Sequence, residues 1–220
     1  MTPSDRKQWT KSEIEALDKT QRLHLINSIT GIKPANLIAT QDNNGQCNLG
    51  IFSSIVHLGS QPALLGFILR PSINGNRHTY ENIKATGRYS INAVHQNSTD
   101  RAHYTSAPFP QQDCEFDLAG FEIQHHAEFS GIFVQDAPIQ IGMQFVEALP
   151  IEANNTQMII GSVEFIAINA EGVESDNQLN LQTLGIAGIS GLNRYYELAL
   201  SAQYPQAKVG TFPQAIHSKK

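Results

Sequence analysis

Polar groups suited to binding an anion come at two places in the amino-terminal half of the chain. Ser53 and Ser54 stand where the apolar segment "IFSSIV" turns polar, and they offer hydroxyl and backbone N–H groups. Arg77 supplies a permanent, planar cation. Thr79 precedes "YENI" at a position suited to a helix amino cap, where free N–H groups and the helix dipole attract anions. The alternative is an ordinary cap at Thr79 and a solvated loop charge at Arg77.

Two other kinds of site are disfavoured by the sequence. The eight histidines include the adjacent pair His125–His126, but neighbours on a strand point to opposite faces and cannot easily chelate one ion. The remaining histidines lack the regular spacing of a structural metal site. "IFSSIV" is not the GxSxG turn that presents a nucleophilic serine. We therefore expect neither a metal site nor a catalytic serine.

Composition limits the class of partner. The chain has 220 residues, 40% of them hydrophobic, which is enough to bury one core. Its formal net charge is −5 and it has no run of Lys and Arg, so we expect no nucleic-acid partner. A bound anion would therefore need a local pocket.

Cysteine content and hydropathy bear on the compartment. Cys47 and Cys114 are the two cysteines, and neither belongs to a CxxC pair. A long-range disulfide between them is one alternative, but we expect two free thiols, as in a reducing cytoplasm. The amino-terminal "MTPSDRKQW" has no apolar core, and no apolar run approaches the roughly 18 residues of a membrane span. We expect a cytoplasmic protein with no membrane association.

The pattern of apolar segments predicts many strands and few helices. A helical segment is expected over 10–31, with Ser12 and Glu15 as a capping box and a break near 18–20. Asn44-Gly45 predicts a hairpin turn, because both residues tolerate positive φ. A short helix over 81–87, closed by Gly87, and a long loop over 95–120 with one helical turn are also expected. The strands are expected over 34–40, 48–58, 62–70, 88–94, 131–135, 139–149 and 158–168.

Closely spaced strands with only short helices between them favour an antiparallel barrel or sandwich. A Rossmann sheet is disfavoured, because long helices do not alternate with the strands. The segment "GIAGISG" at 185–191 is not the dinucleotide fingerprint GxGxxG, so its glycines are interpreted as turn or bulge residues.

Segments in a fixed order carry a resemblance to a known family. They are "LINSITGIKPANLIAT" (25–40), "DNNGQCNLGIFSSI" (42–55), "PALLGFILRP" (62–71), "NRHTYENI" (76–83), "TGRYSINAV" (86–94), "QDCEFDLAGF" (112–121), "GSVEFIAI" and "LNRYYEL". Together they resemble the flavin reductase-like, FMN-binding split-barrel family, in its flavoprotein oxygenase-type branch. The resemblance covers about residues 21–200 and rests on order and spacing rather than on one specific motif.

The resemblance implies a mainly β protein, a six-stranded antiparallel Greek-key split barrel with a few short peripheral helices. It implies an amino-terminal extension with a helix (1–20), an FMN-binding split-barrel domain (21–200) and a carboxy-terminal tail (201–220). It also implies a homodimer with FMN at or near the dimer interface.

The implied activity is that of an FMN-dependent oxidoreductase. Electrons would pass from NADH, NADPH or another donor through FMN to a second flavin, oxygen or a small organic substrate. One alternative is a non-catalytic FMN-binding or flavin-carrier protein of the same fold. Another is a barrel that has lost its cofactor and acts through protein–protein contacts.

The resemblance also implies a set of flavin-binding residues. Arg77 and Thr79 would bind the phosphate, and Arg70 is a second candidate for it. His78 departs from the family pattern, which commonly has an acidic residue there, and Cys114 replaces a usual carboxylate. The tail lacks the Gly-Asp-His segment of the short-chain flavin reductases. The full set is Asn48, Phe52, Ser53, Ser54, Arg70, Arg77, His78, Thr79, Asn82, His103, Tyr104 and Ser106.

Overall fold

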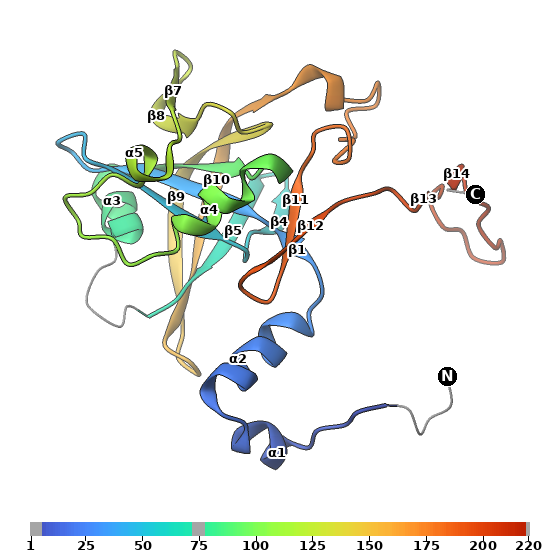
Figure 1. Ribbon diagram of the computed structural model, residues 1–220. Coiled ribbons are helices and arrows are strands. Elements are labelled where there is room, and N and C mark those ends of the chain that lie inside the picture. Colours follow the sequence, from blue (N-terminus) through green and yellow to red (C-terminus); the bar gives the residue numbers. More distant parts are fainter. Residues whose placement is uncertain (1–5, 72–77, 219–220) are drawn as a thin grey trace.

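A seven-stranded antiparallel sheet forms the body of the protein (Figure 1). The computed structural model describes residues 6–71 and 78–218. The strands lie in the order β3 (Cys47–Phe52), β2 (Asn36–Gln41), β6 (Arg88–Ala93), β9 (Ile139–Ile151), β10 (Thr156–Ile168), β5 (Ala63–Leu69) and β4 (Val56–Ser60).

The connection between the two edge strands explains why this sheet closes into a barrel. Strands β3 and β4 lie at opposite edges, yet only residues 53–55 join them. Four Cα steps of about 3.5 Å reach roughly 14 Å, whereas six strand spacings of about 4.8 Å span roughly 29 Å. The sheet must therefore curl until its edges meet, which confirms the predicted mainly β, antiparallel split barrel. The sheet has seven strands instead of six, because the segment expected as one strand over 48–58 breaks at 53–55 into β3 and β4.

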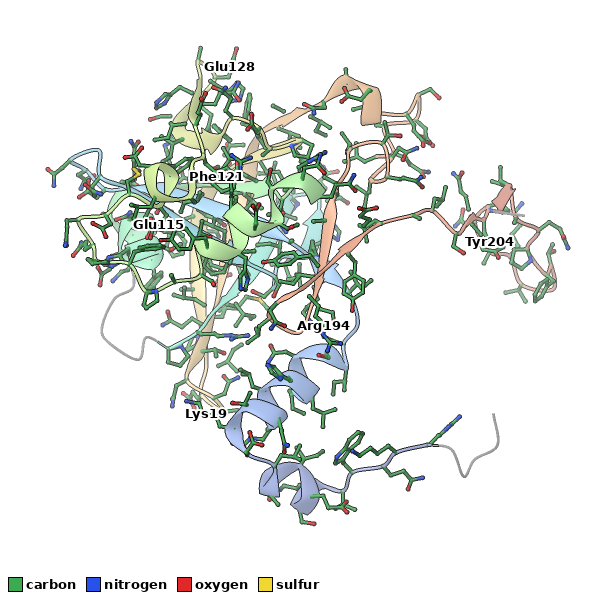
Figure 2. All side chains as sticks on the ribbon, in the orientation of Figure 1. Lys19, Glu115, Phe121, Glu128, Arg194 and Tyr204 are labelled. Carbon is green, nitrogen blue, oxygen red and sulfur yellow. A yellow bond between two sulfur atoms is a disulfide. The ribbon has the colours of Figure 1, made fainter. Side chains whose placement is uncertain are left out.

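The sheet is buried on both faces. On β2, Leu37 and Ala39 join one apolar cluster and Ile38 joins another, as alternation along a strand requires. The second cluster draws on β2, β5, β6, β9 and β10 and so fills the barrel interior. The first lies under two short helices, α4 (Thr99–Tyr104) and α5 (Glu115–Ala119), and strand β8 (Phe129–Val134). Figure 2 shows Glu115 and Phe121 within this packed layer.

The helices begin at different residues from those expected. The helical segment does break near 18, into α1 (Lys11–Ala16) and α2 (Lys19–Ser28), but the capping box is formed by Thr10 and Glu13 rather than by Ser12 and Glu15. Helix α3 (His78–Thr86) begins three residues earlier than predicted and ends at Gly87, whose φ is 70°. The expected long loop over 95–120 contains a 3-10 helix, η2 (Gln96–Ser98), as well as α4 and α5.

The remaining strands form small peripheral sheets. Strand β1 (Lys33–Pro34) pairs with β11 (Ala187–Ser190), which pairs with β12 (Arg194–Glu197). Strand β7 (Ile123–His126) forms a hairpin with β8, and β13 (Ala202–Gln203) pairs with β14 (His217–Ser218). A second 3-10 helix, η3, spans Ala170–Gly172.

The terminal parts that the structure describes, residues 6–28 and 201–218, extend away from the barrel (Figure 1). Figure 2 shows Lys19 on the amino-terminal extension and Tyr204 on the carboxy-terminal one. Within the described residues, no helix is long and apolar enough to cross a membrane.

Candidate functional site

The amino-terminal end of helix α3 lies against strand β3. The side-chain amide of Asn48 on β3 donates a hydrogen bond to the Thr79 hydroxyl oxygen at 3.0 Å. Gly50 faces the same place, since a Cβ added there would lie 4.0 Å from that oxygen. Because a hydroxyl has one hydrogen and two lone pairs, Thr79 keeps its own hydrogen for a further acceptor. The structure thus brings together Asn48 and Thr79, two members of the predicted flavin-binding set that lie 31 residues apart.

One turn further along α3, a second polar contact fixes the helix on the sheet. The amide of Asn82 donates to the Thr40 hydroxyl at 3.1 Å, and both residues are buried. Thr40 pairs with Asn48 in the register of β2 and β3, so the two contacts lie side by side. The amide nitrogen of Asn82 therefore binds the sheet, which positions α3 rather than a ligand.

His78, the first residue of α3, carries a buried and unsatisfied imidazole. Both of its ring nitrogens are buried, and neither has a hydrogen-bond partner in the part of the chain that the structure describes. An unsatisfied buried polar group costs about 1–3 kcal/mol. Such a ring at the start of a helix, where the first backbone N–H groups have no partner within the helix, suits an anionic group of a ligand.

Glu115 is a buried acid close to His78. It is the first residue of α5, is 7% exposed, and accepts a hydrogen bond from the Leu49 backbone N–H at 2.9 Å. Burial raises the pKa of the Glu115 carboxyl, while the Leu49 N–H and the neighbouring His78 ring act in the opposite direction. The carboxylate covers an outward N–H of the edge strand β3, so it helps to hold that strand in place.

The residues at the turn between β3 and β4 have mainly structural contacts. The Ser54 hydroxyl accepts from the Ile68 backbone N–H at 3.0 Å and donates to the Ile68 carbonyl at 3.3 Å, which ties the turn to β5. Phe52 packs edge-on against Phe67, with 5.1 Å between ring centroids. Ser53 is half-buried beside them. The Phe52 ring is the apolar surface of this turn at the split of the barrel, and Phe52 lies two positions from Gly50 on β3.

Of the two arginines in the predicted set, only Arg70 lies in the described part of the chain. Arg70 is exposed at the end of β5, and its guanidinium donates to the Asn27 side chain of α2 at 3.0 Å. The structure thus joins Arg70 to helix α2. Arg77 lies outside the described residues.

The predicted loop residues on α4 and just after it have other partners. Nδ1 of His103 lies 3.2 Å from the Tyr195 hydroxyl oxygen, and burial raises the pKa of Tyr195 to about 12, so the phenol is neutral at physiological pH. Tyr104 packs edge-on against Phe109. The Ser106 N–H donates to the His103 carbonyl. All three predicted residues are exposed.

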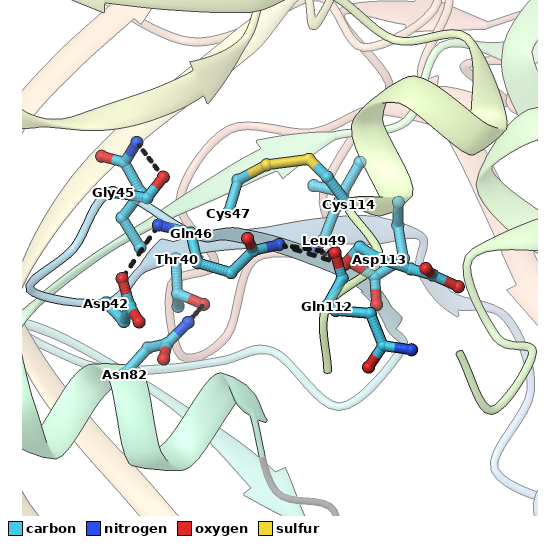
Figure 3. Close-up of a disulfide and its surroundings, with 12 residues drawn as sticks. Thr40, Asp42, Gly45, Gln46, Cys47, Leu49, Asn82, Gln112, Asp113 and Cys114 are labelled. Carbon is cyan, nitrogen blue, oxygen red and sulfur yellow. Dashed lines mark hydrogen bonds between the residues drawn. A yellow bond between two sulfur atoms is a disulfide. The ribbon is translucent and has the colours of Figure 1, made fainter. Parts of the chain in front are cut away.

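The expectation of two free thiols was wrong. Cys47 and Cys114 form a disulfide that joins the first residue of β3 to the residue preceding α5 (Figure 3). No sequence signal favoured this pair, because 67 residues separate the two cysteines and the fold alone brings them together. The contact between Leu49 and Glu115 could not be predicted from the sequence for the same reason, although Glu115 falls in the segment "QDCEFDLAGF" that carries the family resemblance.

Comparison with known proteins identifies the family. The family model of the flavin reductase like domain matches residues 32–184, more than half of the chain. The protein belongs to the flavin reductase-like family. This membership places it among flavin-related oxidoreductases.

Solved structures of this flavin reductase-like type share the fold. A protein from Shewanella frigidimarina NCIMB 400 with a split barrel domain, assigned as a flavin reductase, is 38% identical. The match covers 92% of this chain and 100% of that one, with a TM-score of 0.88. Nitrilotriacetate monooxygenase component B from Bacillus cereus is 15% identical over 90% of this chain and 100% of its own, with a TM-score of 0.79. An FMN-binding protein from Thermus thermophilus is 13% identical over 80% and 91%, with a TM-score of 0.66. At these lower identities the likeness shows the fold alone.

The buried acid of this flavin reductase-like protein should give a pH-dependent stability. Because the folded-state pKa of Glu115 is raised above 4.5, its contribution to stability is present below pH 4.5 and is lost as pH rises through the raised value. Glu115→Gln keeps an acceptor for the Leu49 N–H and cannot ionise. The difference in unfolding free energy, variant minus wild type, should therefore grow as pH rises from 4 to 8 in urea titrations.

Glu128→Gln is the matched control for this experiment. Glu128 is exposed at the tip of the hairpin between β7 and β8 (Figure 2). Its replacement should shift the unfolding free energy by less than about 0.5 kcal/mol at every pH. A difference for Glu115→Gln that stays constant over the whole pH range would contradict the raised pKa.

Proposed function

We propose that the protein is an FMN-dependent oxidoreductase. Electrons pass from NADH, NADPH or another donor through FMN to a second flavin, oxygen or a small organic substrate. Membership of the flavin reductase-like family supports the flavin and the redox chemistry. The split-barrel protein of Thermus thermophilus, which is FMN-binding, supports the choice of FMN.

The observation that carries the proposal is the unsatisfied imidazole of His78. Its two buried nitrogens belong to the first residue of α3, and Thr79 is the next residue of the helix. A phosphate dianion would accept from a ring N–H, from the spare hydrogen of Thr79 and from free N–H groups of the helix. It would thereby remove the cost that His78 imposes on the free protein.

The surrounding residues suit the rest of an FMN molecule. Phe52 and the half-buried Ser53 and Ser54 lie at the split of the barrel, and such an apolar surface with backbone N–H groups fits a flat ring. When bound, FMN supplies the electron-transfer chemistry. The protein's own residues hold the phosphate, orient the ring and restrict access to it. Asn48 fixes the Thr79 hydroxyl, and Asn82 fixes α3 on the sheet.

A homodimer forms part of the proposal. Helices α1 and α2 bury no side chain within the chain. A helix of ten residues is marginally stable by itself, so α2 needs packing that its own barrel does not supply. Its apolar side chains would be covered by a second copy. The exposed apolar residues on or beside these two helices are Trp9, Leu23, Ile26, Ile29 and Ile32.

The purified protein is expected to bind FMN and to be bleached by a reduced nicotinamide. The visible spectrum should show oxidised flavin after purification or after FMN is added. Anaerobic addition of NADH or NADPH should then remove the absorbance in the flavin region. A protein that binds FMN but is bleached by neither nicotinamide would favour a carrier or another donor. A protein that takes up no FMN would refute both the FMN-dependent oxidoreductase and the FMN carrier.

A further inference from the structure

Three consecutive residues of β3 link this strand to different parts of the protein. Cys47 is bonded to Cys114, and the Leu49 backbone N–H donates to the Glu115 carboxylate at 2.9 Å. Between them, the Asn48 side chain holds the Thr79 hydroxyl at 3.0 Å. The two links to segment 112–115 thus flank the contact of Asn48 with α3 on the outer edge of β3, while the ladder with β2 holds the inner edge.

Segment 112–115 covers the outer edge of the sheet. Strand β3 is an edge strand, and outward N–H groups of such a strand need a cover or water. The side-chain amide of Gln46 lies 3.4 Å from the carbonyl oxygens of Gln112 and Asp113, next to the disulfide (Figure 3). At this distance the amide contacts are weak, so the disulfide and Glu115 are the strong attachments of the segment.

The Glu115 attachment is weakened by the burial of its charge. Burial disfavours the ionised carboxylate, and release of the segment would return that carboxylate to water. The disulfide at the preceding residue, Cys114, opposes this release, because it holds Cys114 beside Cys47, the first residue of β3. Without the disulfide, the segment keeps the hydrogen bond between Leu49 and Glu115 as its main attachment to β3, and the burial of the Glu115 charge weakens that attachment.

We propose that the Cys47–Cys114 disulfide is a thiol-responsive clasp, and that a dithiol opens it and thereby lowers the affinity of the α3–β3 site for FMN. The identity of this ligand rests on the proposed function. A thiolate of the dithiol attacks one sulfur, the bond between Cys47 and Cys114 breaks, and a mixed disulfide forms. The second thiol of the reagent closes its own disulfide. Two electrons and two protons pass to the cysteines, which end as two thiols.

The clasp is accessible to such a reagent. Cys47 and Cys114 are both half-buried rather than enclosed in the core. Exposed residues lie close to each in the chain, at 43–45 and at 111–112. Thiol–disulfide exchange requires that a thiolate reach one sulfur in line with the bond. The two cysteines pack against the core on one side and lie at the edge of the sheet on the other, so a reagent would approach from that edge.

The test compares FMN affinity in the oxidised and the reduced full-length protein. A thiol assay should find no free thiol before treatment with dithiothreitol and two afterwards. The reagent is removed without oxygen, and FMN binding is then followed by quenching of flavin fluorescence. We expect the dissociation constant to rise by about tenfold, within the range of about 5- to 150-fold typical of coupled sites. Reoxidation should restore the original value.

The double variant C47S/C114S is the matched control. It should bind FMN as the reduced protein does, and dithiothreitol should not change its affinity. If this variant does not fold, the cycle of reduction and reoxidation in the wild type gives the answer alone. Two free thiols in the untreated protein, or equal affinity in the two redox states, would overturn the proposal.

A readout without ligand separates failure of the clasp from failure of the proposed function. Hydrogen exchange of the amides of residues 47–50 should speed up on reduction, because segment 112–115 leaves the edge of β3. If the oxidised protein binds no FMN, the proposed function is wrong, and the amide exchange still decides whether the clasp opens. Unchanged exchange at Leu49 after full reduction would refute it.

Discussion

Replacing His78 with leucine is expected to weaken FMN binding by about 10- to 100-fold. Hydrogen bonds to charged groups contribute about 1.5–3 kcal/mol, and each 1.4 kcal/mol changes an affinity tenfold. The imidazole of His78 has two buried nitrogens without a partner at the amino-terminal end of α3. Removing it leaves Thr79, the helix N–H groups and the Arg77 expected from the family resemblance to bind the phosphate.

The same substitution should leave the free protein equally stable or more stable. An unsatisfied buried polar group is unfavourable, so an apolar side chain of similar size removes a cost of about 1–3 kcal/mol. Opposite effects on stability and on binding are typical of residues kept for function. If His78 served only packing, its replacement would lower the free energy of unfolding, and the affinity for FMN would fall together with it.

Two measurements on the same preparation check this expectation. Fluorescence titration gives the dissociation constant of FMN, and urea unfolding without FMN gives the free energy of unfolding. His125→Leu is the matched control, because His125 is exposed on β7, away from α3 (Figure 1). It should change neither quantity appreciably. Normal FMN affinity in His78→Leu would remove this residue from the site.

The strands were predictable from the sequence because each is a local apolar pattern. The run over 62–70 became β5 and the run over 88–94 became β6, with ends shifted by one residue. The hairpin at Asn44-Gly45 was placed correctly, although only Gly45 has positive φ. The break of the long segment at 53–55 was not predicted, although it falls at Ser53 and Ser54, where the apolar run turns polar.

The predicted site shows the same division between local and long-range information. The resemblance indicated Asn48 and Thr79, and the structure brings them into contact. It gave no sign that the Ser54 hydroxyl binds the backbone of Ile68, or that Arg70 contacts Asn27. These partners are set by how strands and helices far apart in sequence meet. A polar residue at a family position can therefore serve the fold as well as a ligand.

Phe67→Ala is expected to lower the free energy of unfolding by about 3–5 kcal/mol. Phe67 on β5 is fully buried in the cluster that fills the barrel. Its ring packs edge-on against Phe52 at 5.1 Å and against Tyr89 at 5.8 Å between centroids. Truncation of a buried phenylalanine loses its burial and leaves a cavity, and losses of this size are usual. Urea or guanidinium unfolding measures the change.

Phe67→Ala should also lower the affinity for FMN, because the Phe52 ring at the site packs against Phe67. Leu118→Ala, at a residue 47% exposed on α5, should change stability by less than about 0.5 kcal/mol and leave FMN binding intact. Phe67→Leu keeps part of the packing and should lie between the control and Phe67→Ala in both measurements. A loss below about 1 kcal/mol in Phe67→Ala would mean that the barrel interior collapses around the missing ring. In that case Phe52 would move with it, and FMN affinity would fall even though stability is kept.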